Sequence, residues 1–80
     1  MKAMIKVTLK NGVLDPQGKA IMGSLGSLGF DGYDNVRQGK YFELDIEAAD
    51  KAGALLKVKD MCEKLLANTV IENYEIEIAD

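Results

Sequence analysis

The chain has 80 residues, a single cysteine, and neither histidine nor tryptophan. One cysteine excludes an internal disulfide, and without histidine or further thiols a zinc-type ligand cluster is excluded as well. Thirteen acidic and ten basic residues give a net charge of −3, which disfavours a nucleic-acid partner because phosphate binding needs clustered lysine and arginine. A folded chain of this size buries only about 60–65% of its unfolded surface, so we expect a thin core and self-association.

The beginning of the sequence carries Lys2 and Lys6 inside its apolar run, which is not the pattern of a secretory signal. No stretch approaches the ~18–20 consecutive apolar residues of a membrane-spanning helix. We therefore expect a cytoplasmic protein without a membrane partner, folded as a single domain over residues 1–80, in which Cys62 is reduced.

Residues 2–10 alternate between apolar and polar side chains, with Ile5, Val7 and Leu9 on one face, which predicts a half-buried strand. Asp15 and Pro16 then predict a helix start, because an aspartate accepts a first-turn amide and a proline at the first helical position loses no hydrogen bond. The helix is expected to end near Gly29. Its apolar face is predicted from residues spaced i, i+4 and i+7: Ile21, Leu25 and Leu28.

The middle of the chain predicts a second strand around Val36 and a third over residues 41–47. Gly39 is the only turn signal between them, so one long bent strand is an open alternative. Alternation along residues 41–47 puts three apolar side chains on one face of the third strand: Phe42, Leu44 and Ile46.

Asp50 is a plausible cap for a second helix, which is expected to end at residues 67–69. Its predicted apolar stripe consists of Leu55, Val58, Cys62 and Leu65, broadened by Met61 and Leu66. A last strand is predicted over residues 70–78, with its apolar side chains on one face: Tyr74, Ile76 and Ile78.

The predicted order is β-α-β-β-α-β. Two helices on one face of an antiparallel sheet make an α+β, ferredoxin-like two-layer sandwich. A long bent central hairpin and an exchange of elements between protomers remain open within this fold class.

The sequence shows no set of residues typical of catalysis. The glycines at 23, 26 and 29 close a helix, whereas a phosphate-binding loop opens one. Cys62 lies on the apolar stripe without a histidine to activate it. The carboxylates of the last two strands alternate with apolar residues, as on a solvated strand face. We therefore expect no catalytic residue, cofactor site or metal site in this chain.

Three segments together resemble a known family: Val13-Leu14-Asp15-Pro16-Gln17-Gly18, Val36-Arg37-Gln38-Gly39-Lys40-Tyr41-Phe42-Glu43-Leu44, and the segment from Met61 to Tyr74 that contains Leu66-Ala67-Asn68-Thr69. In this order and at this chain length they resemble PurS, the small-subunit family of phosphoribosylformylglycinamidine synthase. The resemblance covers essentially the whole chain.

The resemblance implies a subunit that is not itself catalytic. The full enzyme converts formylglycinamide ribonucleotide, glutamine and ATP to the amidine in purine synthesis. A glutamine amidotransferase subunit makes ammonia, and a large synthetase subunit consumes it with ATP and magnesium. The small subunit is expected to form a homo-oligomer, a dimer or a tetramer, and to join the other two so that ammonia is not lost to solvent.

Four residues at motif positions are candidates for partner contacts: Arg37, Lys40, Tyr41 and Asn68. They are polar or amphipathic and lie at predicted strand and helix ends. A different function class stays open beside this one. A small-molecule-sensing regulatory domain of the ACT type shares the β-α-β-β-α-β order and would bind its ligand near the loops at Gly12 and Gly32.

Overall fold

The structure is a computed structural model that describes all 80 residues. Along the chain it contains β1 (Lys2–Leu9), α1 (Pro16–Ser27), β2 (Gly39–Asp45), α2 (Lys51–Met61) and β3 (Glu72–Ala79). A π-helical segment, η1 (Cys62–Leu66), continues α2. Neither helix has the length and apolar character needed to cross a membrane.

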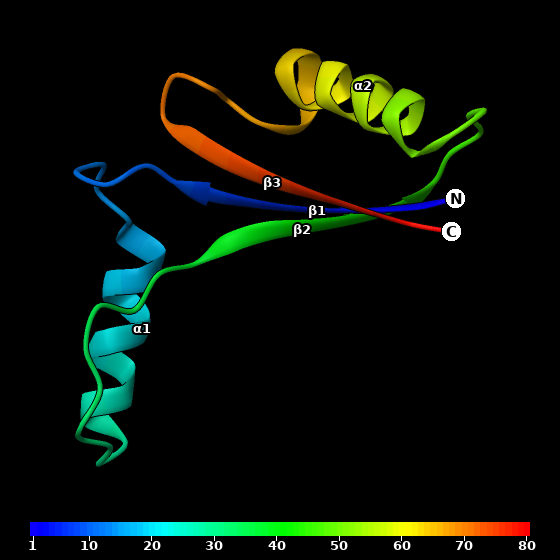
Figure 1. The fold of residues 1–80 in the computed structure, drawn as a ribbon. Coiled ribbons are helices and arrows are strands. Elements are labelled where there is room, and N and C mark those ends of the chain that lie inside the picture. The colour runs from blue at the N-terminus through cyan, green and yellow to red at the C-terminus, as the bar shows by residue number, and fades with distance from the viewer.

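The strands form one antiparallel sheet in the order β2-β1-β3, with β1 in the centre. In this register Lys6 lies opposite Tyr41 of β2 and Glu75 of β3. Since side chains alternate along a strand, these residues share one face of the sheet. No helix covers that face (Figure 1), and we call it the open face.

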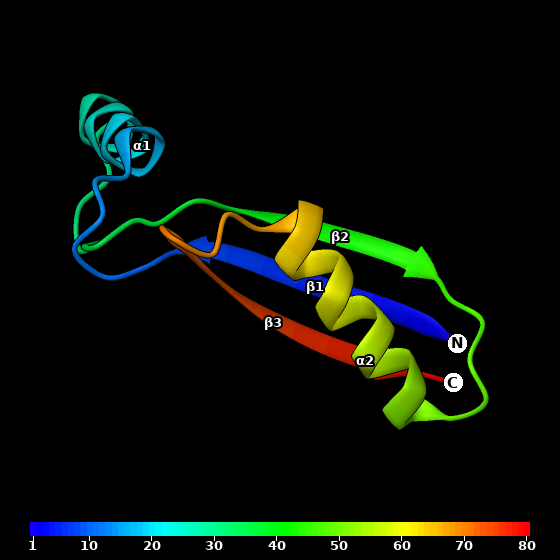
Figure 2. The same ribbon diagram turned by 90° about the horizontal axis from the view of Figure 1, so that it is seen from above.

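The core lies between α2 and the opposite face of the sheet, which α2 crosses diagonally (Figures 1 and 2). Its fully buried residues come from β1 and from the continuous helix of α2 and η1: Ala3, Ile5, Val7, Ala54, Val58 and Cys62. The predicted apolar faces of β2 and β3 pack against this cluster. The predicted inward faces of the strands are therefore confirmed.

Helix α1 lies beyond the end of the sheet and points away on the side opposite α2 (Figures 1 and 2). The chain returns along this helix, where the Tyr33 hydroxyl donates to the Met22 carbonyl oxygen at 2.9 Å. We call α1 and residues 28–35 the arm. The molecule measures 51 × 26 × 15 Å with a radius of gyration of 16.0 Å. A compact chain of this length would have about 12 Å, so the arm makes the protomer elongated.

The fold prediction is right in class and wrong in two respects. The protein is α+β, but it has three strands in the order β-α-β-α-β. The region around Val36 belongs to the segment that returns from α1 to β2, which we call the return segment. There Gly32 and Asn35 adopt positive φ values of 73° and 56°, which interrupt the extended backbone that a strand needs. The alternative of one long bent strand is not observed either, because β2 begins at Gly39.

The second error concerns α1, which was expected on the same face as α2. Its predicted apolar side chains Ile21 and Leu28 are 37% and 73% exposed. Three glycines within the helix leave its surface without side chains to pack on a sheet: Gly18, Gly23 and Gly26. The two-layer arrangement is therefore made by α2 alone within one protomer.

The predicted stripe of the second helix is partly wrong. Its N-terminal cap is as predicted, with the Gly53 amide donating to Asp50 Oδ1 at 2.8 Å. However, the buried residues are spaced by four along α2, whereas Leu55 and Met61 are 42% and 38% exposed. In η1 the Ala67 amide donates to the Cys62 carbonyl oxygen at 3.0 Å. This i→i+5 hydrogen bond adds a residue to the turn and so turns Leu65 away from the sheet. The Leu65 side chain is 83% exposed.

Candidate functional site

The chain passes between the sheet and the arm twice, along residues 9–15 and residues 36–40, and we call these two crossings the neck. Asp15 lies at its centre and is only 9% exposed. Its Oδ1 accepts the Gly18 amide of α1 at 2.8 Å, and its Oδ2 accepts the Gln38 amide at 3.0 Å. One carboxylate therefore caps the arm helix and anchors the chain just before β2.

The electrostatics of the neck favour an ionised Asp15. The amide hydrogen bond from Gln38, then that from Gly18, lower the pKa of Asp15, and the nearby charge of Arg37 adds to this effect. The carboxylate is therefore charged at neutral pH, as its hydrogen bonds require.

Arg37 connects three parts of the neck. Its Nε lies 3.8 Å from Asp15 Oδ2. One terminal nitrogen, Nη2, donates to the Leu9 carbonyl oxygen at the end of β1, and Nη1 donates to Asn11 Oδ1 at 3.5 Å. The planar guanidinium fork fits this divided set of acceptors, which an ammonium group on lysine would not match. Arg37 therefore ties β1, the outgoing loop and the start of the arm together.

Two glycines allow the neck to pack this closely. A Cβ atom at Gly18 would overlap the Val36 carbonyl oxygen, and one at Gly39 would overlap the Val7 carbonyl oxygen. The first contact sets the arm helix against its return segment, and the second sets β2 against β1. Both positions need glycine because backbone approaches backbone there.

Lys40 and Asn68 meet at Glu72, one of the carboxylates of the last strand that the sequence placed on a solvated strand face. Lys40 Nζ lies 3.4 Å from Glu72 and 3.5 Å from the Leu66 carbonyl oxygen. The Asn68 amide donates to Glu72 Oε1 at 2.7 Å. Glu72 precedes the inward-facing Tyr74 by two residues, and this spacing is the sequence signal that places it on the same face of the sheet.

Tyr41 lies apart from the other three candidates, on the open face. Its hydroxyl donates to Glu43 Oε1 at 3.2 Å, and partial burial followed by the neighbouring Glu43 raises its pKa. A broad hollow of about 600 Å³ lies beside it. The residues that line this hollow are Met4, Lys6, Tyr41, Glu75, Ile76 and Glu77.

The neck also borders a shallow hollow of about 260 Å³, lined by Leu9, Asp15, Pro16, Gln17, Gln38, Gly39, Lys40 and Glu72. Its charged groups are paired within the chain, as Asp15 with Arg37 and as Lys40 with Glu72. No three histidine, cysteine, aspartate or glutamate side chains come together as potential metal ligands. Chemically, this arrangement holds two parts of the protein in a fixed relation.

Cys62 is fully buried in the core. Desolvation, with a smaller contribution from Glu63, raises the pKa of its thiol. The thiol is therefore protonated at neutral pH and is a core side chain, as its place on the apolar stripe predicted.

The three motif segments quoted above converge at the neck. The first supplies Asp15 and Gly18, the second supplies Arg37, Gln38 and Lys40, and the third supplies the Asn68–Glu72 turn. Segments far apart in the sequence thus build one joint between sheet and arm.

Comparisons with known proteins agree with one another. The family model PurS, described as phosphoribosylformylglycinamidine (FGAM) synthase, matches residues 2–80. The PurS subunit of phosphoribosylformylglycinamidine synthase from Synechocystis is 55% identical over 74 residues, 92% of this chain and 74% of that protein. The structure of Bacillus subtilis PurS is 51% identical and superposes with a TM-score of 0.87 over 99% of this chain and 98% of that one. A chain in the structure of PurLQS from Thermotoga maritima is 37% identical, with a TM-score of 0.88 over 95% of this chain and 93% of that one.

Proposed function

Since the chain belongs to the PurS family of phosphoribosylformylglycinamidine synthase subunits, we propose that it is the non-catalytic small subunit of that enzyme in purine biosynthesis. It joins the glutamine amidotransferase subunit to the large ATP-dependent synthetase subunit, so that ammonia passes between them. The match over nearly the whole chain to a subunit of the Thermotoga maritima PurLQS structure carries this proposal.

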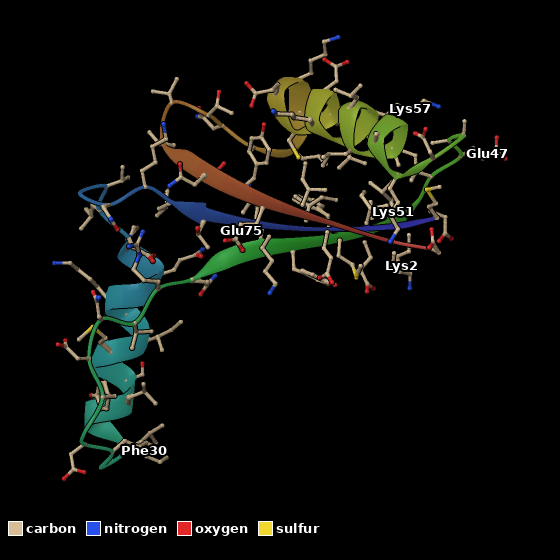
Figure 3. The ribbon with its side chains drawn as sticks, viewed as in Figure 1. Lys2, Phe30, Glu47, Lys51, Lys57 and Glu75 are labelled. Atoms are coloured by element: carbon tan, nitrogen blue, oxygen red, sulfur yellow. The ribbon has the colours of Figure 1, made fainter.

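The surface of the protomer supports a role in assembly. Large apolar side chains are exposed on the arm, on the outer side of α2 with η1, and in the turn that follows: Leu28, Phe30, Leu56, Leu65 and Val70. Phe30 lies at the far end of the arm (Figure 3). Exposed apolar groups of this extent are typical of surfaces that other chains cover.

The shape of the protomer supports a homo-oligomer, a dimer or a tetramer. The arm projects at an angle to the open face (Figure 1), and a second copy placed in that angle would bury Tyr41 and the hollow beside it. On the open face Lys6 of the central strand lies between β2 and β3, which carry Glu43, Glu75 and Glu77. Exchange of arms between protomers would supply each sheet with a second helical layer.

The remaining chemistry belongs to the partners in this proposal. ATP and magnesium serve the synthetase subunit, and this chain carries no cofactor of its own. The complex works in the cytoplasm, without nucleic acid or a membrane.

The partner-contact role of Arg37, Lys40, Tyr41 and Asn68 stays a prediction. The ACT-type alternative has no support here, because the sheet lacks its fourth strand and α1 does not cover it.

The bridging role is tested by reconstitution. The purified chain is added to the amidotransferase and synthetase subunits of the same organism, and glutamine-dependent formation of the amidine is measured. We expect co-purification of all subunits and restoration of the glutamine-dependent rate. Full glutamine-dependent turnover by the two partners alone would refute the proposal.

Self-association is tested separately by sedimentation velocity at micromolar concentration. We expect two or four chains per particle, and we expect Tyr41→Asp on the open face to weaken association. Leu56→Asp, on the outer side of α2, is the matched control and should leave the homo-oligomer intact. A strict monomer for the unmodified chain contradicts this part of the proposal.

A further inference from the structure

The arm is held to the sheet by polar contacts, and this distinguishes it from every other element of the fold. The hydrophobic core takes no residue from α1 or from its return segment. The buried residues here are Asp15, which caps α1, and Gly18 within α1, and neither contributes an apolar side chain. The direction of the arm therefore depends on the hydrogen bonds and the ion pair of the neck.

These contacts act at both crossings. Asp15 joins the first turn of the arm to residue 38 on the returning chain through its two oxygens, at 2.8 and 3.0 Å. Arg37, on the returning chain, reaches across to the Leu9 carbonyl oxygen and to Asn11 on the outgoing chain. The arm and the sheet are therefore joined by side-chain contacts at both crossings.

The side chain of Arg37 is occupied within its own chain. Its exposed fraction is 33%, and its three nitrogens face Asp15, Leu9 and Asn11. These contacts lie at the surface, but they engage the donors that Arg37 would otherwise offer to a partner subunit, the role that its position in the sequence suggested.

We propose that Arg37 and Asp15 are positioning residues that set the angle between the arm and the sheet, and that the assembled enzyme needs this angle for efficient transfer of ammonia. This inference rests on the proposed function, in which the arm and the sheet contact other chains at the same time. Misplacing the arm misaligns the subunits that it joins. Glutamine-dependent turnover then falls, while turnover supported by free ammonium, which needs no transfer, is retained.

The test uses the reconstituted complex with Arg37→Lys, which keeps the charge but loses the fork, and with Asn11→Ala, which removes one acceptor of the fork. Lys64→Ala is the matched control, because it breaks an exposed ion pair to Asp60 at 2.9 Å, far from the neck in the sequence. We expect Arg37→Lys to lower the glutamine-dependent rate about tenfold and to leave the ammonium-dependent rate within about twofold, since small misplacements cost large factors in coupled steps. Asn11→Ala should show a smaller loss, and Lys64→Ala none.

The arm angle is measured directly in the same complexes. Spin labels on cysteines introduced at Ser27 of the arm and Lys59 of α2, both exposed, report the distance between the arm and the body formed by the sheet and α2, with labelled chain diluted in unlabelled chain. We expect the distance distribution to broaden in Arg37→Lys. A control pair at Ala52 and Lys59, both in α2, should not change.

Three outcomes decide the inference. A lower glutamine-dependent rate in Arg37→Lys together with a broadened distance distribution supports it. A lower glutamine-dependent rate with an unchanged distance distribution overturns it, because Arg37 then acts as a direct partner contact. An unchanged glutamine-dependent rate in Arg37→Lys overturns it as well. If the unmodified chain restores no glutamine-dependent turnover, the proposed function itself has failed, and that result is distinct from these three.

Discussion

Asp15 shows how much a single residue decides in this protein. The Asp-Pro pair predicts a helix cap, and the structure confirms that the carboxylate accepts the Gly18 amide. The same carboxylate also accepts the Gln38 amide and faces Arg37, which lie more than twenty residues further along the chain. No local pattern reports these second contacts, because they depend on how the chain returns from the arm.

The lowered pKa of Asp15 predicts a specific loss of stability in acid. The folded state holds this carboxyl below its usual value of 3.8, so its stabilisation is present above that value and is lost as pH falls through the lowered pKa. We expect Asp15→Asn to be less stable than the unmodified chain at pH 7, with the difference shrinking below about pH 4. Urea unfolding between pH 7 and about pH 2 measures both curves. If the free energies of unfolding of the two proteins differ by the same amount at every pH, the lowered pKa does not belong to Asp15.

At the scale of elements, alternation predicted which strand faces are buried, because a strand repeats every two residues whatever its neighbours are. The helix stripe was harder to predict. Leucines at 55 and 65 fit a regular helical repeat, but the π-helical closure between Cys62 and Ala67 changes the repeat in its last turn. The core face of α2 carries Ala54 together with Val58, which the predicted stripe already contained, and both leucines are exposed.

The observed stripe predicts how substitutions in the helix affect stability. Val58 is fully buried, so Val58→Ala should lower the free energy of unfolding by about 2 kcal/mol, through lost burial and the cavity left behind. Leu65→Ala, a larger truncation at an exposed site, should change it by less than about 0.5 kcal/mol in the isolated subunit. Urea denaturation compares the pair. The reverse order would show that Leu65, and not Val58, is the residue that packs in the core.

At the scale of the whole molecule, the sheet with α2 and the arm are two bodies of unequal stability. The sheet body has a buried cluster, whereas the arm contributes nothing to it. Local opening is easiest where few apolar groups are buried. The arm therefore depends on the neck, and in the proposed assembly on other chains, for its order.

Amide hydrogen exchange tests this difference. At dilutions where the chain is monomeric, amides of α1 should exchange at least about tenfold faster than those of β1. Protection of α1 should rise with chain concentration and on assembly with the partner subunits, while β1 changes little. Equal protection of α1 and β1 in the monomer would show that the arm is stable by itself.

The sequence by itself determined the α+β class, the caps at Asp15 and Asp50, the inward faces of all three strands and the family. Each of these follows from local periodicity, from capping chemistry or from motifs that are read in order along the chain. Only the tertiary structure decided that α1 leaves the sheet, that the fourth strand is replaced by a return segment, and that Arg37, Lys40 and Asn68 are engaged within the chain at Asp15 and Glu72. The contacts of Arg37 and Lys40 join segments more than twenty residues apart, which no local pattern reports, whereas the Asn68–Glu72 contact lies within one turn.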